Sequence, residues 1–370
     1  MKIKGDWLAL AEPVCTMLAA GGHRALFVGG CVRNALLGAP VSDLDLATDA
    51  RPERMMELAR AAGLRAIPTG IDHGTVTVLS DGHPYEITTF RRDVDTDGRH
   101  ATVAFTDSVA EDAARRDFTM NALYAEADGT VLDPLGGLPD LMARHVRFVG
   151  EPAARITEDY LRILRFFRFH AIYGDGGPDA EGLAACAEHA DGIDTLSRER
   201  VGAEMKKLLA ARDPAPAIAS MVAVGVLHHV LPGADPKPLA VLVHLEGDLP
   251  PDPIRRLAVL TTEADLRLSR AETARLTRLA TAAREGEDLR ALAFRHGADL
   301  ARNVGLVRGA LIGAAPDLSG IEEAAAATFP VTARDLMPAL SGPALGDRLR
   351  ELESRWIASG FRLTKDQLLG

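Results

Sequence analysis

Two carboxylates separated by one residue carry the plainest chemistry in this sequence. Asp43 and Asp45 alternate with Leu44 and Leu46, so on a β-strand both carboxylates would leave the same face. Mg²⁺ prefers carboxylate oxygens together with substrate phosphates, and two such ions can activate a hydroxyl and stabilise a departing pyrophosphate. A solvated acidic strand face is the alternative, because the pattern Asp-x-Asp is common.

A pair of glycines lies shortly upstream of these carboxylates. Gly29 and Gly30 follow the apolar run 25–28 and precede Arg33, which we expect on a short helix. Bare backbone N–H groups and an arginine at such a turn can bind a triphosphate, and glycine is needed because a Cβ would hold the phosphate away. The spacing matches neither G-x-G-x-x-G nor a Walker A loop, which disfavours a dinucleotide site or a P-loop.

The elements around these residues change character along the chain. Residues 1–150 mix strand and helix signals, whereas strand signals fade after Gly150. Residues 91–108 are charged and poor in large apolar side chains, which predicts a mobile loop. The sequence therefore predicts an α+β chain with an α/β head and an all-α remainder. Strands are expected at 25–28, 43–46, 75–79 and 85–90, and helices at 51–62, 156–171, 199–211, 216–226 and most of 253–312.

Composition predicts a folded protein of two or three packed units. The chain has 370 residues, 47% hydrophobic and 25% charged. No stretch approaches the ~20 apolar residues of a membrane span, and signal-peptide features are missing. Three scattered cysteines argue against a disulfide framework and fit a cytoplasmic location.

The net charge of −10 argues against a nucleic-acid partner. Residues 144–168, however, hold six arginines against three acids, which leaves room for a basic groove.

Taken together, these patterns resemble one known family. LFVGGCVRNALLG at 26–38 with SDLDLAT at 42–48 resembles the first motif of the class II tRNA nucleotidyltransferase and poly(A) polymerase family, and RRDFTMNA at 115–122 resembles the second. Residues 133–141 resemble the link from head to neck, and the pattern E-D-x-x-R at 158–162 resembles the base-recognition motif. The match continues in order to about residue 210, with departures at Asn34 and Tyr160.

The resemblance implies both an architecture and an activity. It implies a polymerase-β-like nucleotidyltransferase head with a mixed sheet at 1–150, a helical neck for base recognition at 151–215, and a helical body and tail for tRNA binding at 216–370. The implied activity is template-independent addition of C, C and A to the 3′ end of tRNA. CTP and ATP would be the substrates, Mg²⁺ would be bound by Asp43 and Asp45, and pyrophosphate would be released.

The resemblance also distributes roles among single residues. It places Glu86 beside Asp43 and Asp45 as a candidate third catalytic carboxylate, although a surface glutamate on a hairpin explains the sequence equally well. Phosphate contacts are implied for Arg116, and contacts to sugar hydroxyls for Asp117 and Asn121. The full set of implied nucleotide-binding residues is Gly29, Gly30, Arg33, Arg116, Asp117, Asn121, Asp159, Arg162, Arg165 and Arg168.

Asp159 and Arg162 suit the reading of a base without a template. C and A present an amino donor beside a ring-nitrogen acceptor, whereas U and G present a carbonyl and an N–H group. A carboxylate only accepts and a guanidinium only donates, so the pair complements C and A and opposes U and G. The resemblance assigns base recognition to this pair and phosphate contacts to Arg165 and Arg168. A salt-bridged solvent-facing stripe on the helix 156–171 would give the same spacing.

Other functions fit parts of the pattern. A poly(A) polymerase or a partial CC- or A-adding enzyme would share the motifs, but the region between the first two motifs lacks the basic-aromatic stretch associated with bacterial poly(A) polymerases. A non-catalytic RNA-binding relative would not need paired carboxylates. A small-molecule nucleotidyltransferase would need neither the base reader nor the long helical body. The expected partners are the tRNA 3′ end, CTP and ATP, with no membrane.

Overall fold

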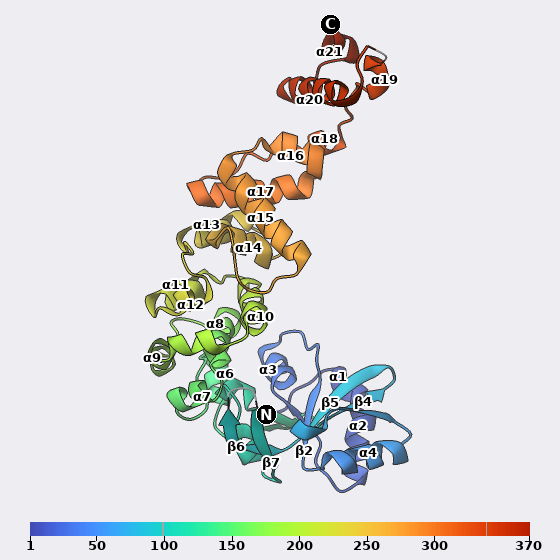
Figure 1. The fold of residues 1–370 in the computed structure, drawn as a ribbon. Coiled ribbons are helices and arrows are strands. Elements are labelled where there is room, and N and C mark those ends of the chain that lie inside the picture. Colours follow the sequence, from blue (N-terminus) through green and yellow to red (C-terminus); the bar gives the residue numbers. More distant parts are fainter. Residues whose placement is uncertain (98–99, 338) are drawn as a thin grey trace. The chain divides into compact units, whose positions relative to one another are not determined.

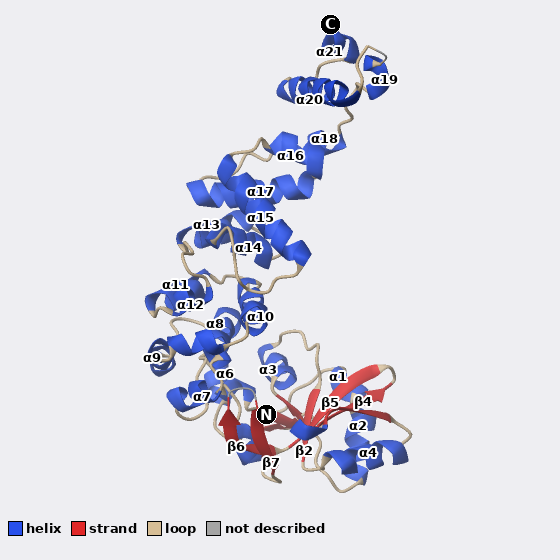
Figure 2. Ribbon diagram, viewed as in Figure 1, coloured by secondary structure: helices blue, strands red, loops and turns tan. Residues whose placement is uncertain are grey.

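The computed structural model describes residues 1–97, 100–337 and 339–370, with the backbone alone for 93–97 and 100–103. The chain divides into two compact units, Met1–Pro232 and Gly233–Gly370. Figure 1 follows the elements along the chain, and Figure 2 shows the strands gathered in its N-terminal part. The last strand of the described residues ends at Leu132. The predicted α+β architecture is confirmed, while the finer division at 150 and 215 stays a prediction.

A mixed seven-stranded sheet forms the centre of the head, in the order β3-β4-β5-β2-β1-β8-β9. Strands β2 and β5 pair in parallel, and the other neighbours pair antiparallel. This pairing brings the two predicted acidic strands side by side. The strands are β1 (Leu26–Val28), β2 (Asp45–Thr48), β3 (Arg65–Gly70), β4 (Thr75–Ser80), β5 (His83–Thr89), β8 (Tyr124–Glu126) and β9 (Val131–Leu132).

Helices cover this sheet and continue beyond it within the first unit. The turn into α3 has Gly29 at φ 69°, and the helix stops at Gly38 in the left-handed region, two positions where glycine avoids a Cβ clash. The helices are α1 (Trp7–Leu10), α2 (Glu12–Ala20), α3 (Gly30–Leu37), α4 (Pro52–Ala61), α5 (Val109–Ala114), α6 (Leu138–Met142), α7 (Pro152–Glu158), α8 (Leu161–Tyr173), α9 (Ala180–Glu188), α10 (Arg198–Leu209), α11 (Ala215–Ala223) and α12 (Val226–Val230), with 3₁₀ turns η1 (Ile71–His73), η2 (Thr119–Asn121) and η3 (Ala190–Thr195).

Residues 91–108 differ from the predicted loop. They form an antiparallel hairpin of β6 (Arg91–Asp97) and β7 (His100–Phe105), followed by the start of α5. Val94, Thr96, Thr102 and Val103 have the β propensity that the surrounding charges concealed in the sequence. Residues 98–99, on which the loop prediction also falls, lie outside the described residues, and the mobility of the segment stays a prediction.

The helix predicted over 156–171 is broken. Helix α7 ends at Glu158, Asp159 has an extended backbone at φ −157° and ψ 105°, and α8 begins after Tyr160. The Asp159 carboxylate accepts a hydrogen bond from the backbone N–H of Leu161 at 3.1 Å. Local bonds of this kind compete with the backbone hydrogen bonds of a helix. The regular spacing from Asp159 to Arg168 therefore does not lie on one helix, and only Arg162 to Arg168 share α8.

An aromatic cluster joins the head to α8. Phe118 and Phe148 come from the chain that leaves the sheet, and Phe166 and Phe169 come from α8. Their ring centroids are 5.0 Å apart for Phe118–Phe148, 5.3 Å for Phe148–Phe166 and 5.0 Å for Phe118–Phe169. All four rings are buried. This packing fixes α8 against the segment that carries Asp117 and Asn121.

The second unit is entirely helical in its described part. Glu246 is buried between Arg255 and Arg256, and a separate cluster of Val331, Leu352, Trp356 and Leu368 closes the C-terminal end. No helix of the described chain is both long and apolar enough to cross a membrane. The helices are α13 (Lys237–Glu246), α14 (Pro253–Leu260), α15 (Arg270–Glu285), α16 (Leu289–His296), α17 (Ala298–Ile312), α18 (Ile321–Ala326), α19 (Ala333–Leu336), α20 (Gly342–Ala358) and α21 (Lys365–Leu369).

The aromatic cluster gives a stability prediction. Phe166→Ala should lower the free energy of unfolding by about 3–5 kcal/mol, because it empties the centre of the cluster. Ile172→Ala is the matched control, since Ile172 lies on the same helix and is 39% exposed; its effect should stay near ~0.5 kcal/mol. Urea unfolding of the full chain measures both. Equal losses in the two variants would show that the cluster does not hold α8 in place.

Candidate active site

The predicted carboxylates meet where β2 begins, beside the middle of β5. Asp45 is the first residue of β2 and pairs in register with Glu86 on β5. Asp43 was expected on the strand but precedes it. All three residues are exposed. Burial of the carboxyl group itself, together with the charges of Glu86 and Asp43, raises the pKa of Asp45 against the lowering effect of Arg116.

This arrangement fits a divalent cation. Asp43, Asp45 and Glu86 line one pocket of about 720 Å³. Carboxylate oxygens are the ligands that Mg²⁺ and similar ions prefer, and a bound cation would offset the neighbouring charges that raise the pKa of Asp45. Within the described residues, no three His, Cys, Asp or Glu side chains lie close enough to form a metal site by themselves. Substrate phosphate oxygens would therefore have to complete the coordination, as is usual for Mg²⁺.

The glycine turn adjoins these carboxylates and is flanked by two guanidinium groups. Gly29 follows β1, which pairs with β2, so the turn lies beside Asp45. A Cβ at Gly29 would lie 3.5 Å from Nη1 of Arg116, and one at Gly30 would lie 3.8 Å from Nη2 of Arg33. The two glycines thus keep open a space that faces the guanidinium groups of Arg116 and Arg33 and the start of α3. Positive charge together with the N-terminus of a helix is a combination that binds phosphate.

A buried aspartate holds Arg116 in this place. Arg116 Nη2 lies 3.2 Å from Asp112, and its Nε donates to the Tyr124 hydroxyl at 3.1 Å. The Asp112 carboxylate is 1% exposed and also accepts from Arg115 Nε, the Tyr124 hydroxyl and the backbone N–H of Arg91. Burial alone would raise the pKa of Asp112, but Arg116 and Arg115 lower it. Both arginines pair with Asp112, and Arg116 also lies beside Gly29, while its contact with a phosphate stays a prediction.

Four of the expected nucleotide-binding residues form one hydrogen-bonded chain. Arg165 Nε donates to Asp117 Oδ2 at 2.8 Å, and Asn121 Nδ2 donates to Asp117 Oδ1 at 2.9 Å. Arg33 Nη1 donates to the Asn121 side-chain oxygen, and Arg33 Nη2 donates to the Tyr173 hydroxyl at 2.7 Å. Arg33 is only 6% exposed, with its guanidinium carbon 4.0 Å from the centroid of the Tyr173 ring. Burial lowers the pKa of Arg33 despite Tyr173 and Asp117, which raise it.

The predicted base readers have other partners in the structure. Arg162 pairs with Glu158, not with Asp159, and also donates to the backbone oxygen of Arg155 at 2.7 Å. Asp159 pairs with Arg200 on α10 at 2.6 Å. Both readers are partly exposed. Their part in recognising a base stays a prediction, which now has to include Arg200 and Glu158.

Arg168 is held by a neighbouring helix. Its Nε lies 2.6 Å from Oε2 of Glu204 on α10, an ion pair without hydrogen-bond alignment. Its guanidinium also lies over the Phe169 ring, with 4.6 Å to the centroid. Arg165 uses Nε and Nη2 for Asp117 and is 31% exposed in its side chain, so part of its fork still faces outward. Of the two, Arg165 is better placed to meet a phosphate.

Sequence reasoning missed the residues that hold the site together. Asp112, Tyr173, Arg200 and Glu204 each bind a predicted site residue, and the last three do so from a distant segment. Asp112 could have been found, because it lies three and four residues before the arginine pair on a short helix, the spacing of helical neighbours. The other three depend on tertiary packing alone.

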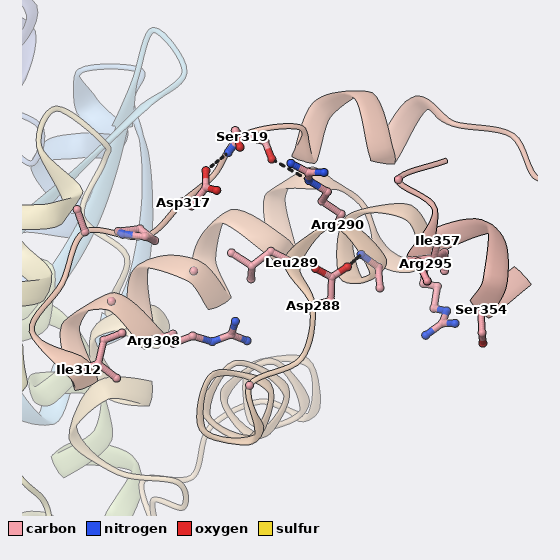
Figure 3. Close-up of a pocket in the computed structure, with 18 residues that line it drawn as sticks. Asp288, Leu289, Arg290, Arg295, Arg308, Ile312, Asp317, Ser319, Ser354 and Ile357 are labelled. Carbon is pink, nitrogen blue, oxygen red and sulfur yellow. Dashed lines mark hydrogen bonds between the residues drawn. The ribbon is translucent and has the colours of Figure 1, made fainter. Parts of the chain in front are cut away.

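A further pocket of about 870 Å³ lies in the second unit and holds none of the predicted residues (Figure 3). Its arginines already have protein partners. Arg290 donates to the Ser319 oxygen at 3.3 Å, Arg308 to the Glu287 oxygen at 2.6 Å, and Arg295 pairs with Glu353 at 2.7 Å. The catalytic candidates therefore all belong to the first unit.

Comparison with known proteins agrees with this geometry. A family model described as "Poly A polymerase head domain" matches residues 25–147, and one described as "Probable RNA and SrmB- binding site of polymerase A" matches residues 178–237. The mouse protein named CCA tRNA nucleotidyltransferase 1, mitochondrial, is 35% identical over 382 residues, which span 95% of this chain and 87% of that protein. The chain belongs to the class II tRNA nucleotidyltransferase and poly(A) polymerase family.

Other members of the family extend the comparison. The CCA-adding enzyme of Levilactobacillus brevis is 40% identical over 230 residues, or 62% of this chain and 57% of that protein. The crystal structure of the Bacillus stearothermophilus CCA-adding enzyme in complex with CTP has a TM-score of 0.78 at 28% identity, covering 96% of this chain and 94% of that one. The resemblance drawn from the motifs is confirmed, and the chain is a nucleotidyltransferase of this family. Membership implies use of a divalent metal.

The facing carboxylates make a prediction about stability and metal binding. Asp45→Asn removes a charge next to Glu86, so without divalent ions the melting temperature should rise by roughly 2–4 °C per kcal/mol of relieved repulsion. Added Mg²⁺ should stabilise the unchanged protein by mass action and the variant much less. Glu53→Gln is the control, because Glu53 is an exposed acid on α4. A full Mg²⁺ increment in Asp45→Asn would show that Asp45 binds no cation.

Proposed function

We propose that this nucleotidyltransferase adds C, C and A to the 3′ end of tRNA, using CTP and ATP and releasing pyrophosphate. The observation that carries the proposal is the register of Asp45 with Glu86 beside a glycine turn that faces Arg116. The names of the relatives that match most of the chain support the choice of tRNA and of the CCA sequence.

The proposed reaction assigns separate tasks to the groups around the turn. The 3′-hydroxyl oxygen of the RNA releases its proton to solvent and bonds to the α-phosphorus of the triphosphate, and the bond from this phosphorus to the bridging oxygen of the leaving pyrophosphate breaks. The N–H groups at Gly29 and Gly30 and the guanidinium of Arg116 hold the triphosphate. Asp43 and Asp45, with Glu86 as a third candidate, are proposed to bind Mg²⁺, which when bound supplies charge neutralisation at the reacting oxygens. Residues 216–370 are proposed to bind the tRNA.

Base selection is proposed to lie at the break between α7 and α8. The carboxylate of Asp159 accepts from the amino group of C or A, and the guanidinium of Arg162 donates to the ring nitrogen. The extended backbone at Asp159 supports this, because it releases the carboxylate from the helix surface. The pair Arg200–Asp159 at 2.6 Å then fixes the direction of the acceptor.

Location in the cytoplasm stays a prediction from the sequence.

The proposal is tested by offering tRNA transcripts that end before CCA, after CC and after CCA, each with one labelled nucleoside triphosphate at a time. We expect CMP on the first, AMP on the second and nothing on the third. Asp45→Ala should reduce incorporation to below about 1%, since loss of charge stabilisation in the transition state costs several kcal/mol. Continued addition of AMP to the finished end would indicate a poly(A) polymerase, and addition confined to one step would indicate a partial enzyme. No addition by the unchanged protein would refute the proposal.

Base selection gives a second prediction. Asp159→Ala should reduce discrimination against UTP and GTP by about 10- to 100-fold, because a hydrogen bond to a charged partner contributes roughly 1.5–3 kcal/mol. Arg200→Gln should have a smaller effect of the same kind, since it leaves the acceptor without its fixed direction. Arg165→Ala is the control and should weaken all four triphosphates alike, because a phosphate contact carries no base information. The ratio of kcat/KM values on tRNA lacking CCA measures this. Full discrimination in Asp159→Ala would place the reader elsewhere.

A further inference from the structure

The carboxylate of Asp112 divides its hydrogen bonds between two parts of the head. Oδ2 accepts from Arg116 Nη2 at 3.2 Å and from the Tyr124 hydroxyl at 2.7 Å. Oδ1 accepts the backbone N–H of Arg91 at 3.2 Å and Nε of Arg115 at 3.0 Å. With 1% of its side chain exposed, the carboxylate depends on these donors and not on water. One oxygen thus serves the arginine beside the glycine turn, and the other serves the first residue of β6.

Asp112 and Tyr124 bind one edge of the Arg116 guanidinium and leave its other edge open. Nε donates to the Tyr124 hydroxyl at 3.1 Å, and Nη2 donates to Asp112. Nη1 has no hydrogen bond within the described residues, and it is the atom that a Cβ at Gly29 would approach to 3.5 Å. Because a guanidinium is planar and its N–H groups have fixed directions, holding one edge sets the direction of the other. The triangle of Asp112, Tyr124 and Arg116 therefore directs Nη1 to the glycine turn.

This triangle lies on the sheet face that carries Asp45. Tyr124 on β8 is in register with Val28 on β1. Leu26 leaves the same face of β1 as Val28 and is in register with Ala47 on β2. Ala47 in turn leaves the same face as Asp45, because successive side chains of a strand alternate. Burial raises the pKa of Asp45, and the guanidinium of the triangle opposes this effect, as expected for a charge on the same face.

The other oxygen of Asp112 meets the hairpin β6–β7 where it leaves the sheet. Arg91 is the first residue of β6 and follows the buried Phe90, whose N–H donates to the Thr48 oxygen at 2.7 Å. Phe90 also packs in one buried cluster with Ala113, which follows Asp112 in the chain. The chain is therefore fixed on both sides of the bond between Arg91 and Asp112. Through this bond the hairpin touches the carboxylate that directs Arg116.

We propose that Asp112 is a positioning residue that makes the affinity for the triphosphate depend on the base of the hairpin β6–β7. Asp112 acts through Arg116 and does not itself touch the substrate. The assignment rests on the triphosphate contact of Arg116 in the proposed function. Because Arg116 meets phosphate oxygens alone, the dependence is the same for CTP and for ATP. By linkage, a bound triphosphate must in return strengthen the bond between Arg91 and Asp112.

Replacing one carboxylate oxygen tests this division of bonds. Asp112→Asn keeps a single accepting oxygen, so it can serve Arg91 or Arg116 but not both. Its affinity for inorganic tripolyphosphate with Mg²⁺, measured by calorimetry, should fall by about ten-fold, because a hydrogen bond between charged groups is lost. KM for CTP and KM for ATP should rise by the same factor, with KM for tRNA unchanged. Glu111→Gln is the matched control, since Glu111 is an exposed acid on the same helix. Equal losses in the two variants, or unequal changes for CTP and ATP, would overturn the proposal.

A double-mutant cycle separates positioning from general destabilisation. Arg116→Gln removes the guanidinium, and in this background Asp112→Asn should lower the affinity for tripolyphosphate no further. Tyr124→Phe keeps the buried ring and removes only the hydroxyl, so it gives a smaller loss of the same kind and serves as the second variant if Asp112→Asn does not fold. This loss should also vanish in Arg116→Gln. Penalties that multiply would show that Asp112 and Tyr124 do not act through Arg116.

Hydrogen exchange tests the link to the hairpin without turnover. Tripolyphosphate should slow the exchange of the Arg91 amide in the unchanged protein and leave it unaltered in Asp112→Asn, as followed by mass spectrometry of overlapping peptides from the full chain. Equal slowing in both proteins would overturn the link through Asp112. Failure of the unchanged protein to add CMP would refute the proposed function and leave this result standing. Failure of the unchanged protein to bind tripolyphosphate would instead refute the contact of Arg116, and this proposal with it.

Discussion

The need to satisfy one buried guanidinium organises the first unit. Arg33 is 6% exposed, so its charge requires partners, and it finds them in Asn121 and Tyr173. Asn121 in turn donates to Asp117, and Asp117 accepts from Arg165. The chain of bonds therefore runs from α3, which follows the glycine turn, through Asn121 and Asp117 to α8, which it meets at Arg165 and Tyr173. Because removal of one member leaves a buried charge unpaired, the glycine turn and α8 are held as one unit.

The same hydrogen bonds show that side chains of the second motif, residues 115–122, bind other protein groups. Asp117, Asn121 and Arg165 were each expected to touch a nucleotide, yet in the structure they first touch one another. Burial would raise the pKa of Asp117, but Arg165 and Asn121 lower it, so its charge belongs to the folded protein and does not await a ligand. A nucleotide that contacts this segment meets donors whose directions are already fixed. Such preorganisation reduces what must be ordered on binding.

Sequence reasoning reached the fold class and the glycine turn from local periodicity and backbone rules, and it reached the neighbouring acidic strands from the family resemblance. It failed where partners come from distant segments. The break at Asp159 depends on a bond to Leu161 and on the pair with Arg200, which no spacing reveals. The hairpin β6–β7 was missed because its charges outweighed its β-branched residues in the sequence. Nothing in the motif shows that Tyr173 lies over Arg33, and the expected contact of Arg33 with a nucleotide stays a prediction.

The acidic residues near the site fall into two groups: those that hold other side chains in place and those that are left without a partner. Asp112 and Asp117 are buried, each meets two or more donors, and arginines lower the pKa of both. Asp45 belongs to the second group. Within the described residues, its carboxylate has no hydrogen bond or ion pair. Burial raises the pKa of Asp45, and the charges of Glu86 and Asp43 raise it further. Keeping such a cluster lowers stability and has no packing reason, since its members are exposed. An acid that is left repelling its neighbours is one whose partner arrives from solution, and here that partner must be positive.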